Sequence, residues 1–140
     1  MNNLNIGRVM LGGLVAGLIL NIGEFVYNGV LMANQMMAWN AKHNFPPEPT
    51  GSFFVIVTLL TFVLGIVMVL LYACIRPRFG PGVKTAILAS LFFWFGICFY
   101  MGYFFVALWQ WPTNTYILGM VWCLVEYGLA TVIGAALYKE

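Results

Sequence analysis

The sequence predicts an all-α integral membrane protein, a four-helix bundle that forms a single transmembrane domain over residues 1–140. The chain is 63% hydrophobic and only 7% charged, whereas soluble domains average about 45–50% apolar and about 25% charged residues. Its apolar residues gather in four runs, each close to the length of about 20 residues that crosses a bilayer as a helix. The runs do not alternate in polarity, which disfavours the strands of a membrane β-barrel.

The four predicted spans cover residues 9–32, 53–75, 85–108 and 116–138. The first resembles a signal peptide in position, but its apolar run exceeds the usual core of about 7–15 residues and contains Glu24. No small-x-small cleavage motif follows it, so we expect it to be retained as a span.

The connections between the spans differ in length. The first, residues 33–52, is long, and its part 34–44 has no helix breaker, so this part is predicted to extend the first helix until prolines stop it. The second, residues 76–85, is a compact Pro/Gly turn, and the third, residues 109–114, is short. Short connections make the second and third helices, and the third and fourth, antiparallel neighbours.

The basic residues predict an N-in/C-in orientation. With four spans, the N-terminus, the second connection and the C-terminus share one side. Five basic residues fall on that side against one, Lys42, on the other, which is the positive-inside pattern. Both termini are therefore expected in the cytoplasm of a bacterium, with the protein in the inner membrane as a multi-pass chain. The five residues are Arg8, Arg76, Arg78, Lys84 and Lys139.

Three of these basic residues, Arg76, Arg78 and Lys84, lie in or beside the second connection and are expected to contact lipid headgroups or a partner. Because the basic residues flank helices and form no separate surface, we expect no nucleic-acid partner. The expected partners are membrane lipids, further copies of the chain or other membrane subunits.

Cysteine and histidine offer little for a cofactor. Cys74, Cys98 and Cys123 lie within predicted spans without a CxxC pair, and buried cysteine commonly behaves as a small hydrophobic residue. His43 lies in the first connection, so no histidine is available to hold a haem at membrane depth. No cofactor and no metal are predicted, while a bound lipid or pigment is left open.

The first span carries a stripe of small and polar residues with spacings of 4, 4, 3 and 4, which places them on one helical face. Its Gly-x-x-x-Gly part lets another backbone approach closely. Its polar part surrounds a glutamate with two asparagines, whose amides could donate hydrogen bonds to the carboxyl group. Polar groups in lipid need such partners, so this face is predicted to lie inside a bundle or oligomer. The stripe consists of Gly13, Gly17, Asn21, Glu24 and Asn28.

The fourth span repeats this pattern with Gly119, Cys123, Glu126, Ala130 and Gly134 on one face. From the helical rise, the depths of the two glutamates differ by about 5–8 Å. The two carboxyl groups could therefore meet if the first and fourth helices pack together.

The two middle spans carry faces that predict helix packing through small residues. Gly65 and Gly102 are the glycines of these faces, and they add to the packing set of the outer spans. The second span offers Thr58, Thr61, Gly65, Met68 and Tyr72, and the third Ala86, Ser90, Trp94, Cys98 and Gly102.

Three interpretations of Glu24 and Glu126 stay open. They could be protonated structural groups, because burial away from water disfavours the charged form of a carboxyl group. They could bind a proton or cation that is coupled to transport, as intramembrane carboxylates do in pumps and transporters. They could also ligate a metal, although two carboxylates with only Cys123 on the same faces make a poor set for zinc or copper.

We therefore expect a non-enzymatic membrane protein, a structural or accessory subunit that associates through its small-residue faces and holds a buried, protonated Glu24/Glu126 site. The alternative is a small proton- or cation-coupled transporter that uses Glu24 and Glu126, with Asn21 and Asn28 beside them. No catalytic residue is predicted, because no nucleophile–base pair is evident in the sequence.

The chain resembles an uncharacterised family of small bacterial four-span inner-membrane proteins. The resemblance rests on residues 11–17 (LGGLVAG), 21–25 (NIGEF) and 71–82 (LYACIRPRFGPG), and on the ending from 125–126 (VE) through 134–140 (GAALYKE). It covers nearly the whole chain and implies the four-span architecture, but no activity.

The layout is also similar to that of small multidrug transporters, which have four short helices and a glutamate in the first helix used for proton exchange within a dimer. Glu24 would be the matching position. This chain departs from them by its second glutamate, its long first connection and its strong charge bias, and these departures put the activity in doubt.

Overall fold

The computed structural model describes residues 4–44 and 51–139, and every regular element within them is helical. Four helical stretches are long and apolar enough to cross a membrane, which confirms the prediction of a helical membrane protein with four spans. Each stretch begins two or three residues before the predicted run. The stretches are Ile6–Leu31, Gly51–Phe79, Val83–Trp109 and Thr113–Ala136.

Two of the four stretches change helix type along their length. The first consists of α1 (Ile6–Glu24) followed by the π-helical segment η1 (Phe25–Leu31), and after a bend at Met32 it continues as α2 (Ala33–Lys42). The predicted extension of the first helix is therefore present as α2, while the prolines of 45–49 lie outside the described residues. The remaining elements are α3 (Gly51–Phe79), α4 (Val83–Phe93), the π-helical η2 (Trp94–Met101), α5 (Gly102–Trp109) and α6 (Thr113–Ala136).

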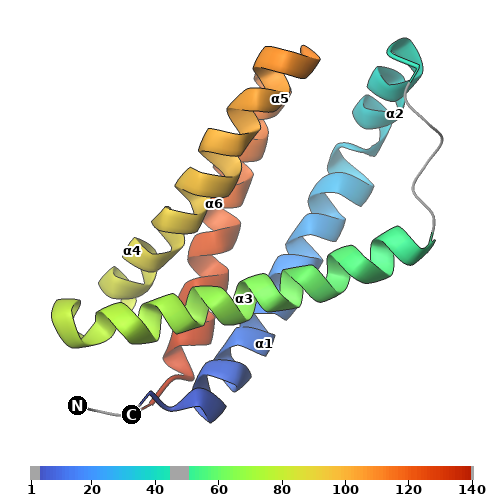
Figure 1. The fold of residues 1–140 in the computed structure, drawn as a ribbon. Helices are drawn as coiled ribbons and strands as arrows, with labels where there is room; N and C mark the ends of the chain where they lie inside the picture. Colours follow the sequence, from blue (N-terminus) through green and yellow to red (C-terminus); the bar gives the residue numbers. More distant parts are fainter. Residues whose placement is uncertain (1–3, 45–50, 140) are drawn as a thin grey trace.

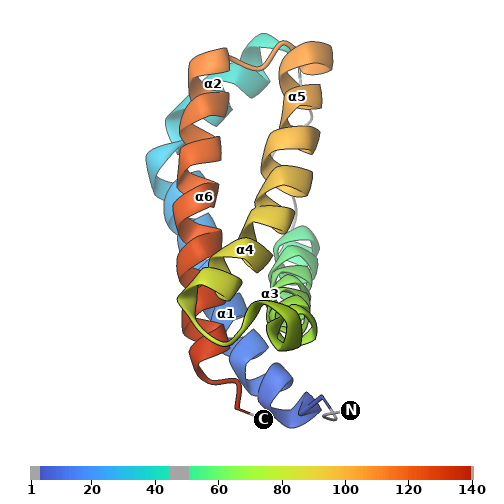
Figure 2. The ribbon, with the colours of Figure 1, turned by 90° about the vertical axis from the view of Figure 1, so that its left-hand side faces the viewer.

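Three of the four stretches run side by side, and the other one, α3, crosses them (Figures 1 and 2). α6 lies between α1 and the α4–α5 stretch and packs on both, whereas α3 packs mainly across α1. The expected antiparallel pairing of α3 with the next helix is limited, because α3 and α4 diverge from the turn that joins them (Figure 1). Asn5 Nδ2 donates a hydrogen bond to the Lys139 carbonyl (3.3 Å), so the two ends of the described chain meet.

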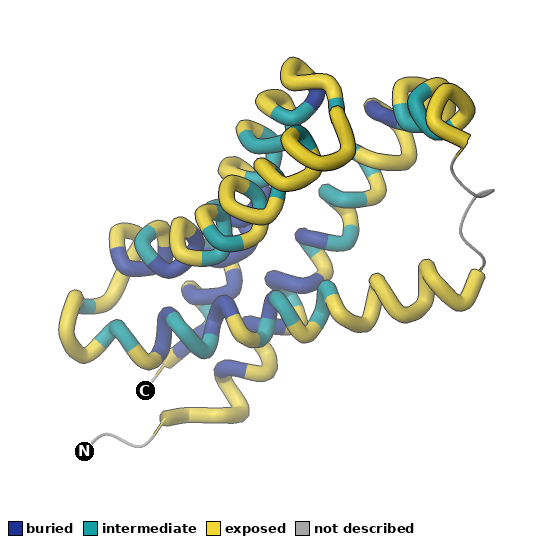
Figure 3. Tube along the Cα trace, turned by 45° about the horizontal axis from the view of Figure 1, so that its top comes forward, coloured by how far each residue is buried: buried dark blue, intermediate teal, exposed yellow. Residues whose placement is uncertain are grey.

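The buried core lies where α1, α3, α4 and α6 cross, and the first half of α3 projects beyond it (Figure 3). Residues 51–60 of α3 are exposed without interruption, including Thr58, so the predicted packing face of this helix is buried only from Gly65 onward. Two buried clusters make the core. One contains Val9, Tyr72, Ala73, Ala86, Ala89, Ala135 and Tyr138, and the other Ala16, Leu20, Met68, Val69, Tyr127 and Ala130.

The crossing of α1 and α3 depends on Gly65. A Cβ at this position would lie 2.6 Å from the Gly13 carbonyl oxygen and 2.7 Å from the Gly17 Cα. The Gly-x-x-x-Gly segment of α1 thus receives the backbone of α3 at very short range, which is the geometry that small residues permit between membrane helices. The structure places the other predicted packing glycines, Gly102, Gly119 and Gly134, against Tyr116, Tyr27 and Gly12.

The end of α3 differs from the predicted end of the second span. The second span was expected to end at Ile75, but α3 continues to Phe79 with Pro77 inside its last turns. Proline removes only one backbone donor, and the helix closes with a hydrogen bond from the Gly80 amide to the Arg76 carbonyl (2.8 Å). The chain reverses at Gly80, whose φ of +82° suits a residue without a side chain.

The three basic residues of this region have different surroundings. The Arg76 guanidinium lies 5.5 Å from the centre of the Tyr138 ring, which ties the end of α3 to the C-terminal residues. Arg78 and Lys84 are exposed.

We expect Gly65→Ala to lower the free energy of unfolding by about 1–3 kcal/mol, because the added methyl group would force the α1 and α3 backbones apart. Gly128→Ala is the matched control, since a Cβ there has no neighbour within 4 Å. Unfolding of the purified protein in mixed micelles measures both. Equal effects of the two substitutions would contradict the role of this crossing.

Candidate functional site

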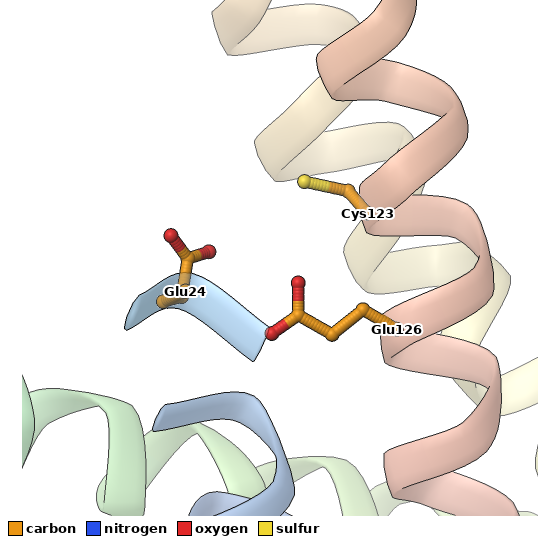
Figure 4. Close-up of side chains that lie close together, drawn as sticks. All are labelled: Glu24, Cys123 and Glu126. Carbon is orange, nitrogen blue, oxygen red and sulfur yellow. The ribbon is translucent and has the colours of Figure 1, made fainter. Parts of the chain in front are cut away.

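The two intramembrane glutamates come together because α1 packs closely on α6. A Cβ at Gly134 would lie 2.6 Å from the Gly12 carbonyl oxygen, so these two backbones are in direct contact. Glu24 ends α1, and Glu126 is in the middle of α6. Figure 4 shows the Glu126 side chain reaching from α6 toward the end of α1 that carries Glu24.

A third side chain, Cys123, completes the cluster from α6 (Figure 4). One carboxylate oxygen of Glu24, one of Glu126 and the Cys123 sulfur all lie within 4.8 Å of one another. Cys123 precedes Glu126 by three residues, so both project from the same side of α6 toward Glu24. The arrangement offers two hard oxygen donors and one soft sulfur donor to a single point.

The Glu126 carboxyl group is buried and has no hydrogen-bond partner. Glu126 is only 6% exposed, and neither carboxylate oxygen is hydrogen-bonded within the described part of the chain. The Trp122 indole N–H and the Glu24 backbone lie beside this carboxyl. The indole N–H is likewise buried without a hydrogen-bond partner in the described residues. Leaving such a group unsatisfied costs about 1–3 kcal/mol.

Gly23 makes room for this carboxyl group. A Cβ at position 23 would lie 2.5 Å from Cδ of Glu126, so any side chain there would have to displace the carboxyl. The sequence interpretation missed Gly23, because the residue lies off the predicted stripe and only the crossing of α1 with α6 reveals its role.

Glu24 has a more polar environment than Glu126. It is half-buried, and Asn28 Nδ2 donates a hydrogen bond of 2.6 Å to its Oε2. The expected donation from Asn21 is wrong. Asn21 Nδ2 instead donates to the Gly17 carbonyl (2.8 Å) and to the Thr58 carbonyl of α3 (3.4 Å).

The predicted stripe of the first helix therefore divides between two neighbours. Gly13, Gly17 and Asn21 face α3, whereas Glu24 and Asn28 face the side of α6. The π-helical turns of η1 begin directly after Glu24. A wider helical turn shifts the residues that follow relative to a regular helix, and such segments occur frequently at functional sites.

A cavity of about 410 Å³ lies beside the carboxyl groups, between η1 and α2 on one side and η2, α5 and α6 on the other. Its lining includes Glu24 and Cys123, while Glu126 is buried behind them. Both π-helical segments contribute to the wall, through Tyr27 and Asn28 of η1 and Cys98 of η2. The full lining is Glu24, Tyr27, Asn28, Met32, Met36, Ile97, Cys98, Gly102, Phe105, Trp111, Thr115, Tyr116, Gly119, Met120, Cys123 and Tyr127.

Sulfur is more prominent in this cavity than the sequence suggested. Cys98 and Cys123 were interpreted as small hydrophobic residues, but both line the cavity, and neither is fully buried. Three methionines, Met32, Met36 and Met120, line it as well. Cys74 is exposed and does not contribute. The spacing of these residues in the sequence gives no signal of this convergence, because they come from α2, η2, α6 and the bend at Met32.

Comparison with protein-family models, with curated proteins and with solved structures finds no match for this chain. The chemistry of the site therefore has to be inferred from its own residues.

We expect Glu126→Met to raise the free energy of unfolding by about 1–3 kcal/mol, because it removes a buried polar group that has no partner. Val125→Met is the matched control, since Val125 is the next residue of the same helix and is 57% exposed. Unfolding in mixed micelles is again the measurement. A loss of stability in Glu126→Met would show that the carboxyl group holds the bundle together, which is the purely structural interpretation.

Proposed function

We propose that this protein is a small proton- or cation-coupled membrane transporter that uses Glu24 and Glu126. The observation that carries the proposal is the buried, unpartnered carboxyl group of Glu126 beside the half-buried Glu24 at the wall of a 410 Å³ cavity. A carboxyl group at membrane depth is costly and marks ion pathways and proton relays. An unpartnered one is poorly suited to a structural role, because it contributes no hydrogen bond in return for its desolvation.

The two glutamates have complementary positions for such a function. Glu24 lines the cavity and is held by Asn28, so it can exchange a proton or cation with the cavity. Glu126 is enclosed by α1 and α6 and can receive charge only from its immediate neighbours. Two ionised carboxylates this close repel each other. A bound cation offsets this repulsion, so cation binding favours loss of protons from Glu24 and Glu126, and protonation of the glutamates favours release of the cation. This exchange is the basis of the proposed coupling.

In this function the chain has an N-in/C-in orientation. Both termini lie in the cytoplasm of a bacterium, in accordance with the distribution of the basic residues. The hydrogen bond between Asn5 and the Lys139 carbonyl supports placing the two ends on one side. Met36 and Trp111, from the first and third connections, line the cavity, so in this orientation the cavity extends to the extracytoplasmic ends of the helices. The role is non-catalytic.

We expect proteoliposomes containing the wild-type protein to change internal pH when one cation of a panel of monovalent and divalent chlorides is added outside. Glu24→Gln and Glu126→Gln keep the size of the side chain but cannot exchange a proton, so both should abolish the response. An enclosed pH-sensitive dye measures it. A response to no cation of the panel, or equal responses of wild type and both variants, would overturn the proposal.

We expect Gly23→Ala to reduce this pH response strongly while changing the unfolding free energy by less than about 1 kcal/mol, because the atoms that a Cβ would meet belong to the movable end of Glu126. Gly29→Ala is the matched control on the next part of the same helix, where the nearest atoms to a Cβ lie at 3.5 Å in Phe25. The same dye assay and micelle unfolding measure both variants. A full response in Gly23→Ala would show that the position of the Glu126 carboxyl is unimportant.

A second candidate function is that of an accessory subunit that associates with itself or with a larger membrane complex. It is favoured by the uninterrupted exposure of residues 51–60, where α3 projects from the rest of the chain and offers an apolar helix for another one to pack on. The mass of the gently solubilised protein, measured by light scattering with the detergent contribution subtracted, tests it. A monomer with no co-purifying membrane protein would contradict this role.

A further inference from the structure

We propose that Glu24, Cys123 and Glu126 form a binding site for a divalent metal ion of intermediate softness, the class to which Zn²⁺ belongs. The inference deepens the proposed function and rests on it, because it names the cation that the same carboxyl groups would exchange for protons. It goes against the expectation from the sequence, in which one sulfur beside two carboxyl groups made a poor ligand set.

The geometry is close to that of a bound ion. Zinc binds carboxylate oxygen at about 2.0–2.2 Å and thiolate sulfur at about 2.3 Å in a tetrahedral arrangement, so two such ligands of one ion lie about 3.3–3.7 Å apart. The three donor atoms here lie within 4.8 Å of one another. A closure of about 1 Å brings them into range, and the long side chains of Glu24 and Glu126 can supply it by rotation about their terminal bonds.

The unpartnered carboxyl group of Glu126 is the independent observation that points to a ligand. This side chain is only 6% exposed, and it is directed toward Glu24 and Cys123 without a hydrogen bond to either of its oxygens in the described residues (Figure 4). Buried charges in proteins are paired or coordinate metals. A cation between the two carboxylates would satisfy oxygen atoms that the protein itself leaves unsatisfied.

The donor set selects the class of metal. Mg²⁺ and Ca²⁺ take oxygen ligands, about six to eight of them for Ca²⁺, and a thiol is a poor substitute. Cu⁺ prefers thiolate and thioether over carboxylate. Zn²⁺ accepts both sulfur and carboxylate and is satisfied with four ligands. The two carboxylates offset the charge of one divalent ion, which lowers the cost of holding it away from water, and the Cys123 thiolate adds one further negative charge.

The cavity leaves room for the remaining ligand and supplies an approach to the site. Three protein ligands and one open position are typical of zinc sites that exchange a ligand, whereas four protein ligands are typical of structural ones. Met36, Met32, Met120 and Cys98 line the cavity that leads to Glu24 and Cys123. Thioether and thiol groups are weak, polarisable donors that can pass such an ion along without retaining it.

Equilibrium binding of Co²⁺ and Zn²⁺ to the purified 140-residue protein, freed of metal and held in lipid nanodiscs, tests the inference. Co²⁺ serves as the spectroscopic substitute for Zn²⁺, because a thiolate ligand gives it a charge-transfer absorption in the near ultraviolet. We expect one Co²⁺ per chain, displaced by Zn²⁺ and unaffected by excess Mg²⁺ or Ca²⁺. We expect Glu24→Gln and Glu126→Gln to weaken binding by about 100-fold or more, because replacing even an indirect partner of a metal ligand costs about 10–100-fold.

Cysteine variants assign the sulfur ligand. Cys123→Ser should remove the charge-transfer absorption, whereas the matched control Cys74→Ser should keep it, since the exposed Cys74 does not belong to the three-atom cluster. Co²⁺ bound to wild type without this absorption, absorption retained in Cys123→Ser, or binding unchanged in both glutamine variants would each overturn the inference. The same holds if the wild type binds neither ion.

The binding assay needs no gradient, so its result is separable from that of the transport assay. Zn²⁺ binding without any cation-linked pH change would leave the metal site standing and remove the transporter. A pH change with a different cation, together with no Co²⁺ or Zn²⁺ binding, would leave the transporter and remove the metal site.

Discussion

The close contact between α1 and α6 is the constraint on which the rest of the site depends. Gly12 and Gly134 allow these two backbones to touch, because a Cβ on either would collide with the other helix. This contact brings Glu24 within reach of Glu126 and Cys123 and presses the Glu126 carboxyl group against Gly23. A wider spacing of the two helices would leave two separate acidic residues instead of one site.

Burial of the Glu126 carboxyl group without a partner runs against the stability of the fold. In hydrocarbon each unsatisfied polar group costs several kcal/mol, and membrane helices normally turn such groups toward a partner. Here Asn28 serves Glu24, and the other asparagine of the same helix is used by the α1–α3 crossing. The Glu126 carboxyl group therefore has no hydrogen-bond partner among the described residues. The proposed binding of a proton or cation accounts for this arrangement better than a role in stabilising the bundle does.

The cavity lies beside the carboxyl groups and is lined by Glu24 and Cys123. Two π-helical segments contribute to its wall, η1 after Glu24 and η2 with Cys98. Sulfur atoms and tyrosines line it together with Met36 and Trp111 of the first and third connections. The fold thus combines a tightly packed half, where α3 closes the core, with a half that contains a cavity beside a buried acid.

The sequence by itself determined the helical fold class, the four spans and the identity of the two acidic residues, because hydrophobic length and the cost of charge in lipid are local properties of the chain. It also indicated the Gly65 region as a packing face and Asn28 as a neighbour of Glu24, since helical spacing places such residues together. It could not reveal that Asn21 turns to α3, that Gly23 accommodates Glu126, or that α3 crosses the other helices. Only the tertiary structure decided these points, because they depend on which helix meets which face, and close packing of small residues selects that choice for the molecule as a whole.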